Sequence, residues 1–223
     1  MQFWTKKNKE EYPDFWKEYI KLFDKKNQNK SLDTARFIAF DTETTGFDYT
    51  EDRILSIGGI TIINKSIDVS DQLEVYLEQD VFKEQTVPIH GIRRDNNFGK
   101  ISERMALELF INYIGDAILV AHYAEFDRKM IDKALKRNGL GVLKNAFLDT
   151  SILYKKTKHL VYYNDYQNIQ YSLDDLCMDL KISKSDRHTA AGDAFITAMA
   201  FLKILARLNK SKKIELPYLF KIK

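Results

Sequence analysis

The chain has 223 residues, of which 44% are hydrophobic and 30% charged, a balance typical of a globular protein with one sizeable core. Its apolar stretches end well before the roughly 18 residues that a membrane-spanning helix requires, and no apolar signal core follows Met1, so we expect a cytoplasmic protein without a membrane partner. The single cysteine, Cys177, excludes an internal disulfide, and a net charge of +3 is too small to identify a nucleic-acid partner by itself.

Residues 1–31 are predicted to be an N-terminal helical extension that ends in a polar linker. Large apolar side chains recur at helical spacing in this segment, at Trp16, Tyr19, Ile20 and Phe23. Such an aromatic stripe usually packs on its own domain, so we do not interpret it as a ligand site.

Residues 32–209 are predicted to form one α/β domain. Three strands are expected first, as an antiparallel meander, over residues 36–42, 54–63 and 71–77. The proline and glycine in residues 87–92 predict a loop there.

The second half of this domain is predicted to alternate helices with two further strands. Helix, strand, helix and strand are expected over residues 101–114, 117–121, 126–137 and 147–148, followed by helices over 172–180 and 189–209. The apolar faces of the first two helices are predicted to contain Met105, Leu109 and Tyr113, and Met130, Ala134 and Leu135, respectively. This order of elements predicts a mixed five-stranded sheet flanked by helices.

Two acids, Asp41 and Glu43, stand two residues apart at the end of the first predicted strand. Because alternate side chains of a strand point to the same face, both carboxylates leave that face close together. Two such acids raise each other's pKa unless a cation lies between them. A solvated strand end that enters a Thr-Gly turn would show the same pattern.

Two further acids could reach the same place. Asp127 opens a helix soon after the buried strand at 117–121, and Asp193 lies in the first turns of the long C-terminal helix, five residues after His188. Asp127 could instead serve only to stabilise a helix N-terminus with its negative charge, and Asp193 could lie at a solvent-exposed position of its helix. Four clustered carboxylates would offer the hard oxygen ligands that Mg²⁺ or Mn²⁺ prefer.

Three short motifs around these acids match a known family. They are DTETTG at residues 41–46, HYAEFD at 122–127 and HTAAGDA at 188–194. In this order and spacing the chain resembles the DEDD 3′→5′ exonucleases, and the histidine five residues before the last acid is similar to their DEDDh branch. That branch includes the proofreading subunit of bacterial DNA polymerase III, ribonuclease T and oligoribonuclease. The resemblance spans about residues 36–205 and implies a ribonuclease H-like fold.

The resemblance also implies roles for individual residues. It implies that two Mg²⁺ or Mn²⁺ ions are bound by four acids, Asp41, Glu43, Asp127 and Asp193. His188 would be the general base. Contacts with the substrate are expected from Thr44, Thr45, Gly46, Phe47, His90 and Phe126. The chain departs from the family at Tyr123, where an asparagine is usual; since that asparagine is not a metal ligand, we expect activity to be retained.

These features predict a 3′→5′ exonuclease that hydrolyses phosphodiester bonds at single-stranded or frayed 3′ ends of DNA and releases nucleoside 5′-monophosphates. The Thr44-Thr45-Gly46 turn is similar to that of polymerase-associated members. Phe47 is similar to ribonuclease T, so trimming of RNA 3′ ends remains an alternative. A non-catalytic subunit that binds DNA ends or a polymerase is the alternative of another class, and no motif acid has been lost to favour it.

Residues 210–223 are predicted to be a basic and hydrophobic C-terminal tail. The run LPYLF at residues 216–220 resembles the short Leu-Phe peptides that bind bacterial sliding clamps, although it lacks their usual glutamine. A sliding clamp or a DNA polymerase is therefore a candidate protein partner. The alternative is that these apolar side chains fold back on the domain.

Overall fold

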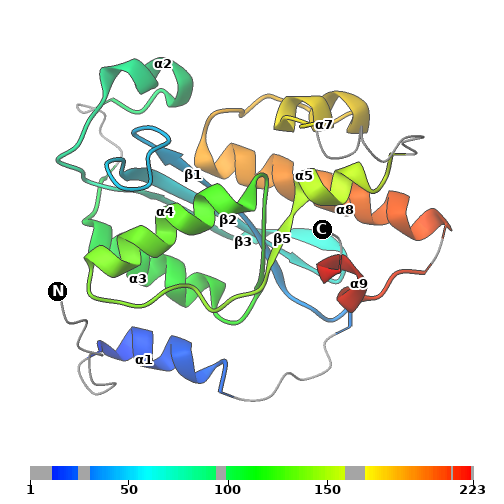
Figure 1. The fold of residues 1–223 in the computed structure, drawn as a ribbon, viewed down its shortest axis with the longest axis horizontal. Helices are drawn as coiled ribbons and strands as arrows, with labels where there is room; N and C mark the ends of the chain where they lie inside the picture. Colours follow the sequence, from blue (N-terminus) through cyan, green and yellow to red (C-terminus); the bar gives the residue numbers. More distant parts are fainter. Residues whose placement is uncertain (1–11, 25–30, 94–98, 159–168, 212, 222–223) are drawn as a thin grey trace.

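A five-stranded mixed sheet forms the centre of the molecule (Figure 1). The computed structural model describes residues 12–24, 31–93, 99–158, 169–211 and 213–221. The strands lie in the order β3-β2-β1-β4-β5, and their bounds are β1 Phe37–Thr44, β2 Ile54–Ile63, β3 Ser66–Tyr76, β4 Ile118–Ala121 and β5 Phe147–Asp149. The first three strands pair antiparallel, whereas β1 with β4 and β4 with β5 pair parallel. The predicted mixed five-stranded α/β sheet is therefore confirmed.

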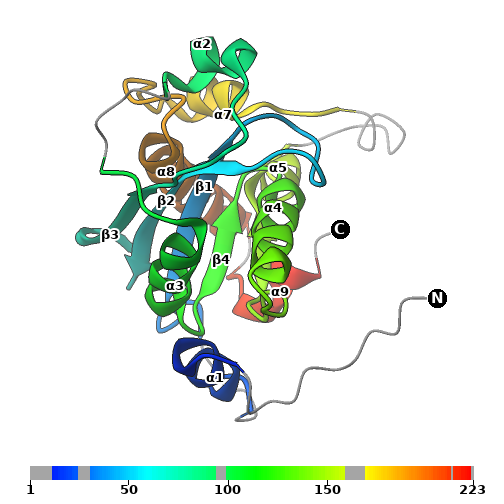
Figure 2. The ribbon, with the colours of Figure 1, turned by 90° about the vertical axis from the view of Figure 1, so that its left-hand side faces the viewer.

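Helices cover both faces of this sheet (Figure 2). Their bounds are α1 Asp14–Lys21, α2 Val87–His90, α3 Glu103–Ile114, α4 Ala124–Arg137, α5 Thr150–Lys155, α7 Leu173–Leu180, α8 Ala190–Ser211 and α9 Leu216–Phe220, with a 3-10 turn, η2, at Glu84–Thr86. Helices α5, α7, α8 and α9 share one core cluster with the sheet, and α1, α3 and α4 share the other. No helix in the described part of the chain is long and apolar enough to cross a membrane.

The central strand β1 divides its side chains between the two cores. Phe37 and Ala39 belong to the cluster that contains α8, whereas Ile38 and Phe40 belong to the cluster that contains α3 and α4. This alternation is the period of two that an extended strand imposes. It continues past residue 40 and thereby determines on which face the acids at the strand end emerge.

In helix α3 the predicted apolar face was wrong for Met105 and Leu109, whereas Tyr113 does pack against the core. Met105 and Leu109 are 55% and 45% exposed, and the side chains that face the sheet are those of Ala106, Leu107, Phe110, Ile111 and Ile114. The helix carries apolar residues on more than one stripe, and the wider stripe is the buried one because it removes more apolar surface from water. In α4 the prediction is confirmed, since Met130, Ala134 and Leu135 are all buried.

Several segments also differ in extent or type from the prediction: helices α5 and α9 were not predicted, and β3 and the segment 87–92 differ as follows. Strand β3 begins at Ser66, five residues before the predicted start, because it continues the tight turn from β2. Part of the predicted loop at 87–92 forms the short helix α2, whose Pro88 lies in the first turn and whose end is Gly91 in the left-handed region, with φ 66°.

Both ends of the described chain are tied to the domain. In α1, Trp16 and Tyr19 are buried, and the Tyr19 hydroxyl donates to Asn145 Oδ1 at 2.6 Å. In α9, Leu216 and Leu219 are buried in the cluster that contains α8. These two leucines therefore fold back on the domain, as one of the two alternatives for the C-terminal tail expected.

Candidate active site

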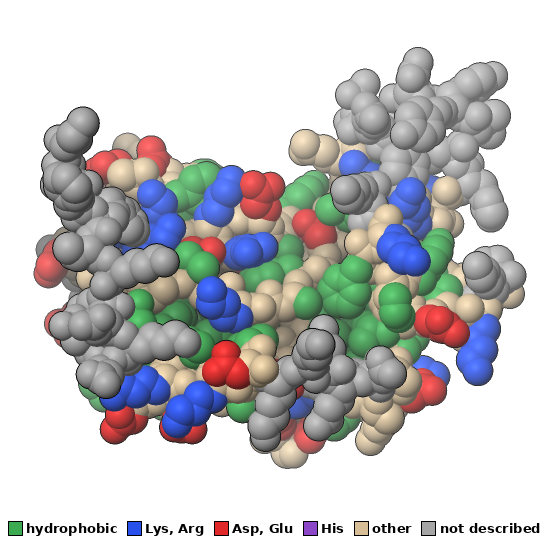
Figure 3. Space-filling model, turned by 60° about the horizontal axis from the view of Figure 1, so that its bottom comes forward, with side chains coloured by type: hydrophobic (Ala, Val, Ile, Leu, Met, Phe, Trp, Pro, Cys, Tyr) green, Lys and Arg blue, Asp and Glu red, His purple; other side chains and the backbone are tan. Residues whose placement is uncertain are grey.

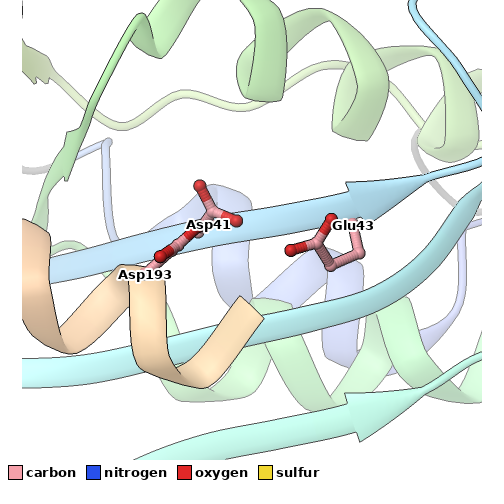
Figure 4. Close-up of side chains that lie close together, drawn as sticks. All are labelled: Asp41, Glu43 and Asp193. Atoms are coloured by element: carbon pink, nitrogen blue, oxygen red, sulfur yellow. The ribbon is translucent and has the colours of Figure 1, made fainter. Parts of the chain in front are cut away.

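The strand period places the first two acids on the face that α8 covers. Asp41 and Glu43 continue the series of Phe37 and Ala39, and Figure 4 shows both carboxylates emerging from β1 next to the first turns of α8. Asp193 enters the same space from α8. One carboxylate oxygen from each of the three acids lies within 4.8 Å of the others.

A glycine allows α8 to approach the strand so closely. Gly58 of β2 pairs with Asp41 of β1, and a Cβ atom at Gly58 would lie 2.1 Å from the carbonyl carbon of Ala190. Real non-bonded carbon atoms approach to about 3.5–4 Å. Only glycine therefore lets the first turn of α8 rest on β2, and this contact brings Asp193 towards Asp41.

Asp193 has one occupied and one unpartnered oxygen. Its Oδ2 accepts hydrogen bonds from the Arg187 guanidinium and, at 3.4 Å, from the backbone N–H of His188. Its Oδ1 is buried and has no hydrogen-bond partner. A buried anionic oxygen without a partner is costly in a protein interior. This oxygen is suited to a ligand that brings positive charge.

Asp127 lies next to the cluster but is held differently. Its carboxylate is buried, and Oδ1 accepts from the backbone N–H of Thr42 at 3.1 Å and from the Thr42 hydroxyl at 2.7 Å. Thr42 stands between Asp41 and Glu43 on β1, so these bonds hold the start of α4 against the strand. The group of three oxygens does not include Asp127, although its charge acts on Asp41 and Glu43.

The electrostatics of the cluster favour a cation. Burial, and then the charges of Asp127, Asp193 and Glu43, raise the pKa of Asp41 well above its usual range. Burial also raises the pKa of Glu43 and that of Asp127 to about 7. Carboxyl groups resist ionisation here because partial burial reduces the solvation of their charges and because like charges lie nearby. Since hard oxygen donors meet at one point with too little compensating charge, these residues fit a divalent metal ion.

His188 follows Arg187 in the loop before α8, and its side chain is exposed. Its backbone is in the left-handed region, with φ 67°. A non-glycine residue in this region is uncommon and is held there by its surroundings. The bond from its backbone N–H to Asp193 ties the loop to the acid cluster.

The segment predicted to contact the substrate is a turn whose threonine side chains are hydrogen-bonded within the protein and whose phenylalanine side chain is exposed. The Thr44 hydroxyl donates to the Gly46 carbonyl at 2.7 Å, and the Thr45 hydroxyl donates to Asp52 Oδ1 at 2.7 Å. Phe47 is 80% exposed. Its ring centroid lies 5.8 Å from that of Phe126, so the two predicted substrate residues form one aromatic surface.

That aromatic surface continues beyond the predicted residues. The ring of Tyr49 lies 5.7 Å from that of Phe126 on centroids, and Lys129 Nζ lies 4.9 Å above the Tyr49 ring. A cation over an aromatic face is attracted by the ring electrons. The surface therefore combines stacking area with an ammonium group, whose charge is offset by Glu125 Oε1 at 2.6 Å.

His90 does not join this group. Its side chain is buried, its Nδ1 accepts from the backbone N–H of Ile92 at 3.0 Å, and its Nε2 lies 3.0 Å from the Thr86 hydroxyl. Because Nδ1 accepts, Nε2 carries the proton and donates to Thr86. Burial lowers the pKa of His90. Both ring nitrogens are thus engaged in the loop, and a contact of His90 with the substrate stays a prediction.

Tyr123, the departure from the family pattern, adopts a left-handed backbone with φ 59°. Asparagine tolerates this conformation well, which explains why it suits this position. Here other bonds hold the turn: the backbone N–H groups of Tyr123 and Ala124 donate to Asp149 at 3.3 and 3.0 Å. The Tyr123 hydroxyl also donates to the Tyr171 carbonyl at 3.0 Å.

Sequence reasoning missed three residues that shape the site. Gly58 could have been found, because a glycine inside a strand signals the close approach of another backbone. Asp52 is buried and holds the turn before it through Thr45 and Asp48, and Lys83 Nζ lies 2.6 Å from its Oδ1. Arg187 binds Asp193. The contact of Lys83 with Asp52 joins segments that the fold brings together, so no local pattern predicts it. Arg187 and Asp193 are only six residues apart, but no periodicity marks them as a pair.

Comparison with known proteins agrees with this geometry. The exonuclease family model RNase_T matches residues 38–201. The chain is 34% identical over 179 residues to DNA polymerase III PolC-type of Caldanaerobacter subterraneus subsp. tengcongensis, and 30% identical over 190 residues to DNA polymerase III PolC-type of Listeria innocua. These matches cover 79% and 85% of this chain, but only 12% of the length of either relative.

Solved structures show the same fold. Exonuclease X in complex with 5′ overhanging duplex DNA superposes with a TM-score of 0.62 at 22% identity, covering 85% of this chain and 99% of that one. E. coli exonuclease I in complex with a dA16 oligonucleotide superposes with a TM-score of 0.67 at 16% identity, and the match covers 84% of this chain and 42% of that one. Together with the family match and the clustered acids, these likenesses show that the chain belongs to the DEDD family of 3′→5′ exonucleases.

Proposed function

We propose that this chain removes nucleotides one at a time from the 3′ end of single-stranded or frayed DNA, using two Mg²⁺ or Mn²⁺ ions and releasing nucleoside 5′-monophosphates. The observation that carries the proposal is the meeting of half-buried Asp41 and Glu43 with buried Asp193 at one point, where Asp193 Oδ1 is left unpartnered. An exposed aromatic surface beside it offers a place for the terminal bases.

The acids would hold the cations. Asp41, Glu43 and Asp193 already meet, and Asp127 would complete the set from the other side of β1 if it gave up or shared its bonds to Thr42. When bound, divalent cations supply the positive charge that activates water and neutralises the scissile phosphate. The raised pKa values of Asp41, Glu43 and Asp127 would then fall, because each carboxylate would gain an opposite charge.

The remaining site residues act on water and on the nucleotide. His188 would accept the proton of the attacking water at an imidazole nitrogen, the side-chain group most often used as a general base. Its side chain is exposed in the loop before α8, so the imidazole is free to turn towards a bound 3′ end. Phe47 and Phe126 would stack on the terminal bases, since every base has an apolar face.

DNA is the proposed substrate because several similar proteins carry DNA in their names or complexes. The PolC-type relatives are DNA polymerases, and the structures of exonuclease X and exonuclease I hold DNA. On the face shown in Figure 3, Lys and Arg side chains are scattered among acidic and hydrophobic ones in the described part of the chain. The described side chains on that face therefore form no continuous basic track for a nucleic-acid backbone.

The test is stepwise shortening of 5′-labelled single-stranded DNA with Mg²⁺ or Mn²⁺, and none in EDTA. A duplex with a mismatched 3′ end should be trimmed faster than a matched one, because paired bases must first unstack at a cost of a few kcal/mol. Asp193→Asn should be inactive although folded. A clear preference for RNA oligomers of matched sequence would show that RNA, and not DNA, is the substrate. Cutting of a circular single strand would contradict exonuclease action.

A further inference from the structure

Arg187 connects the acid cluster to helix α7. Its Nε lies 2.8 Å from Asp174 Oδ1, while its Nη1 binds Asp193 Oδ2. Asp174 stands in the first turn of α7, and the start of that helix is fixed by a capping box between Ser172 and Asp175. The guanidinium thus joins two helices through two of its nitrogens.

Because of this contact, the two carboxylate oxygens of Asp193 have different surroundings. Because Arg187 and the backbone N–H of His188 both bind Oδ2, the carboxylate is held through that oxygen, and Oδ1 is left buried with no hydrogen-bond partner of its own. The side chain of Asp193 is 8% exposed and that of Arg187 is 17% exposed, so water competes little with the bond. A planar guanidinium is suited to such a role because its donors have a fixed geometry.

We propose that Arg187, itself held by Asp174, is a positioning residue for the metal site: it orients Asp193 so that Oδ1 is ready to bind the cation, and it anchors the backbone of His188 beside it. This inference rests on the proposed function, because it assigns Arg187 and Asp174 a part in that same site. It adds two residues outside the three sequence motifs.

Because Arg187 is positively charged, the direction in which its removal changes metal affinity distinguishes charge repulsion from positioning. A positive charge beside a cation site repels the cation, and Arg187 does act against the raised pKa values of Asp41 and Glu43. Its charge is offset by Asp174, whose Oδ1 lies 2.8 Å from Arg187 Nε. If repulsion dominated, removing Arg187 would tighten metal binding; if positioning dominates, removal weakens it.

Mn²⁺ binding to the full chain without nucleic acid, measured by titration calorimetry, separates these effects. Partners that orient a metal ligand are typically worth roughly 10–100-fold in metal affinity, and we expect that loss in Arg187→Ala. Arg187→Lys should lose most of the same affinity although it keeps the charge, because a lysine cannot bridge both carboxylates with fixed donors. Asp174→Asn, at a side chain that is 44% exposed, should fold normally and weaken Mn²⁺ binding less strongly.

A double-mutant cycle tests whether Asp174 acts through Arg187. The effect of Asp174→Asn should vanish in the Arg187→Ala background, since the shared contact is already lost. The matched control is Lys184→Ala, which removes the other cation near Asp174, at 3.7 Å, and should leave Mn²⁺ affinity unchanged.

Three results would overturn the proposal: tighter Mn²⁺ binding by Arg187→Ala, wild-type binding by Arg187→Lys, or a lower melting temperature of Arg187→Ala with unchanged affinity. None of them depends on cleavage. A wild-type chain that binds Mn²⁺ but cuts no nucleic acid would refute the exonuclease proposal and leave the role of Arg187 open to the same titration. A wild-type chain that binds no Mn²⁺ would overturn both.

Discussion

Gly58→Ala is the substitution that tests most directly how the fold assembles the site. The added Cβ would lie 2.1 Å from the Ala190 carbonyl carbon and 2.3 Å from the Ala191 nitrogen, both of them backbone atoms of α8. To restore an ordinary contact of about 3.5 Å, the first turn of α8 must retreat by about 1.4 Å. Asp193 lies one turn further along this helix and would move away from Asp41 with it.

Two consequences follow for measurement. Displacement of a catalytic group by about 1 Å costs roughly 10²-fold in rate, so we expect a loss of that order in kcat/KM on single-stranded DNA. Overpacking of this kind costs about 1–3 kcal/mol, and each kcal/mol lowers the melting temperature by about 2–4 °C in a chain of this size. Mn²⁺ affinity should fall as well, because the Asp193 carboxylate moves away from Asp41 and Glu43.

Gly59→Ala is the matched control. The next residue of β2 faces the opposite side of the sheet, where an added Cβ would lie 2.9 Å from Tyr113 Cε1, a side-chain atom of α3. We expect a comparable or smaller loss of stability with little loss of activity. Wild-type activity and Mn²⁺ affinity in Gly58→Ala would refute this account of the site, and so would an equal loss of activity in Gly59→Ala.

Three further outcomes can be measured with the wild-type chain and single variants. Burial raises the pKa of Glu43 and Asp127 to about 7, so the folded chain binds these protons more tightly than the unfolded chain. The stability that they contribute is present below about pH 4 and is lost as the pH rises through about 7. The melting temperature in EDTA should therefore fall between pH 5 and pH 8, less so in Glu43→Gln, and recover with Mn²⁺; a flat profile would contradict the raised pKa values. His188→Ala should lower kcat by about 10²–10⁴-fold at unchanged melting temperature and Mn²⁺ affinity, and loss of that affinity would make His188 a ligand instead. Phe47→Ala should raise KM for single strands by about tenfold, since stacking on a base is worth about 1–3 kcal/mol, whereas a large fall in melting temperature would make the ring a core residue.

The parts of the site that could be predicted from the sequence are those with a local cause. A strand period of two aligns Asp41 with Glu43, and this relation holds wherever the strand lies. The capping box of α7, with Ser172 and Asp175, is equally local and was expected as a helix start. The three motifs then indicated the family, which the comparisons confirm.

The parts that could not be predicted depend on which surfaces meet. Periodicity alone does not say which of two apolar stripes of α3 is buried, so Leu109 was placed on the wrong face. The bond between Asp127 and Thr42 joins α4 to β1, and neither segment carries a local sign of it. Arg187 in the sequence is one basic residue in a polar loop, and its importance arises only when α7 and α8 lie on either side of it.

The distance along the chain between Asp41 and Asp193 has a consequence for folding. Strand β1 and helix α8 are separated by roughly 150 residues, and closing so long a loop carries a substantial entropic cost. A cation held between the two acids would act as a reversible cross-link between the first strand and the last long helix. Its release would free the C-terminal part of the chain to open first, so hydrogen exchange in α8 should report the metal content of the protein even when no substrate is present.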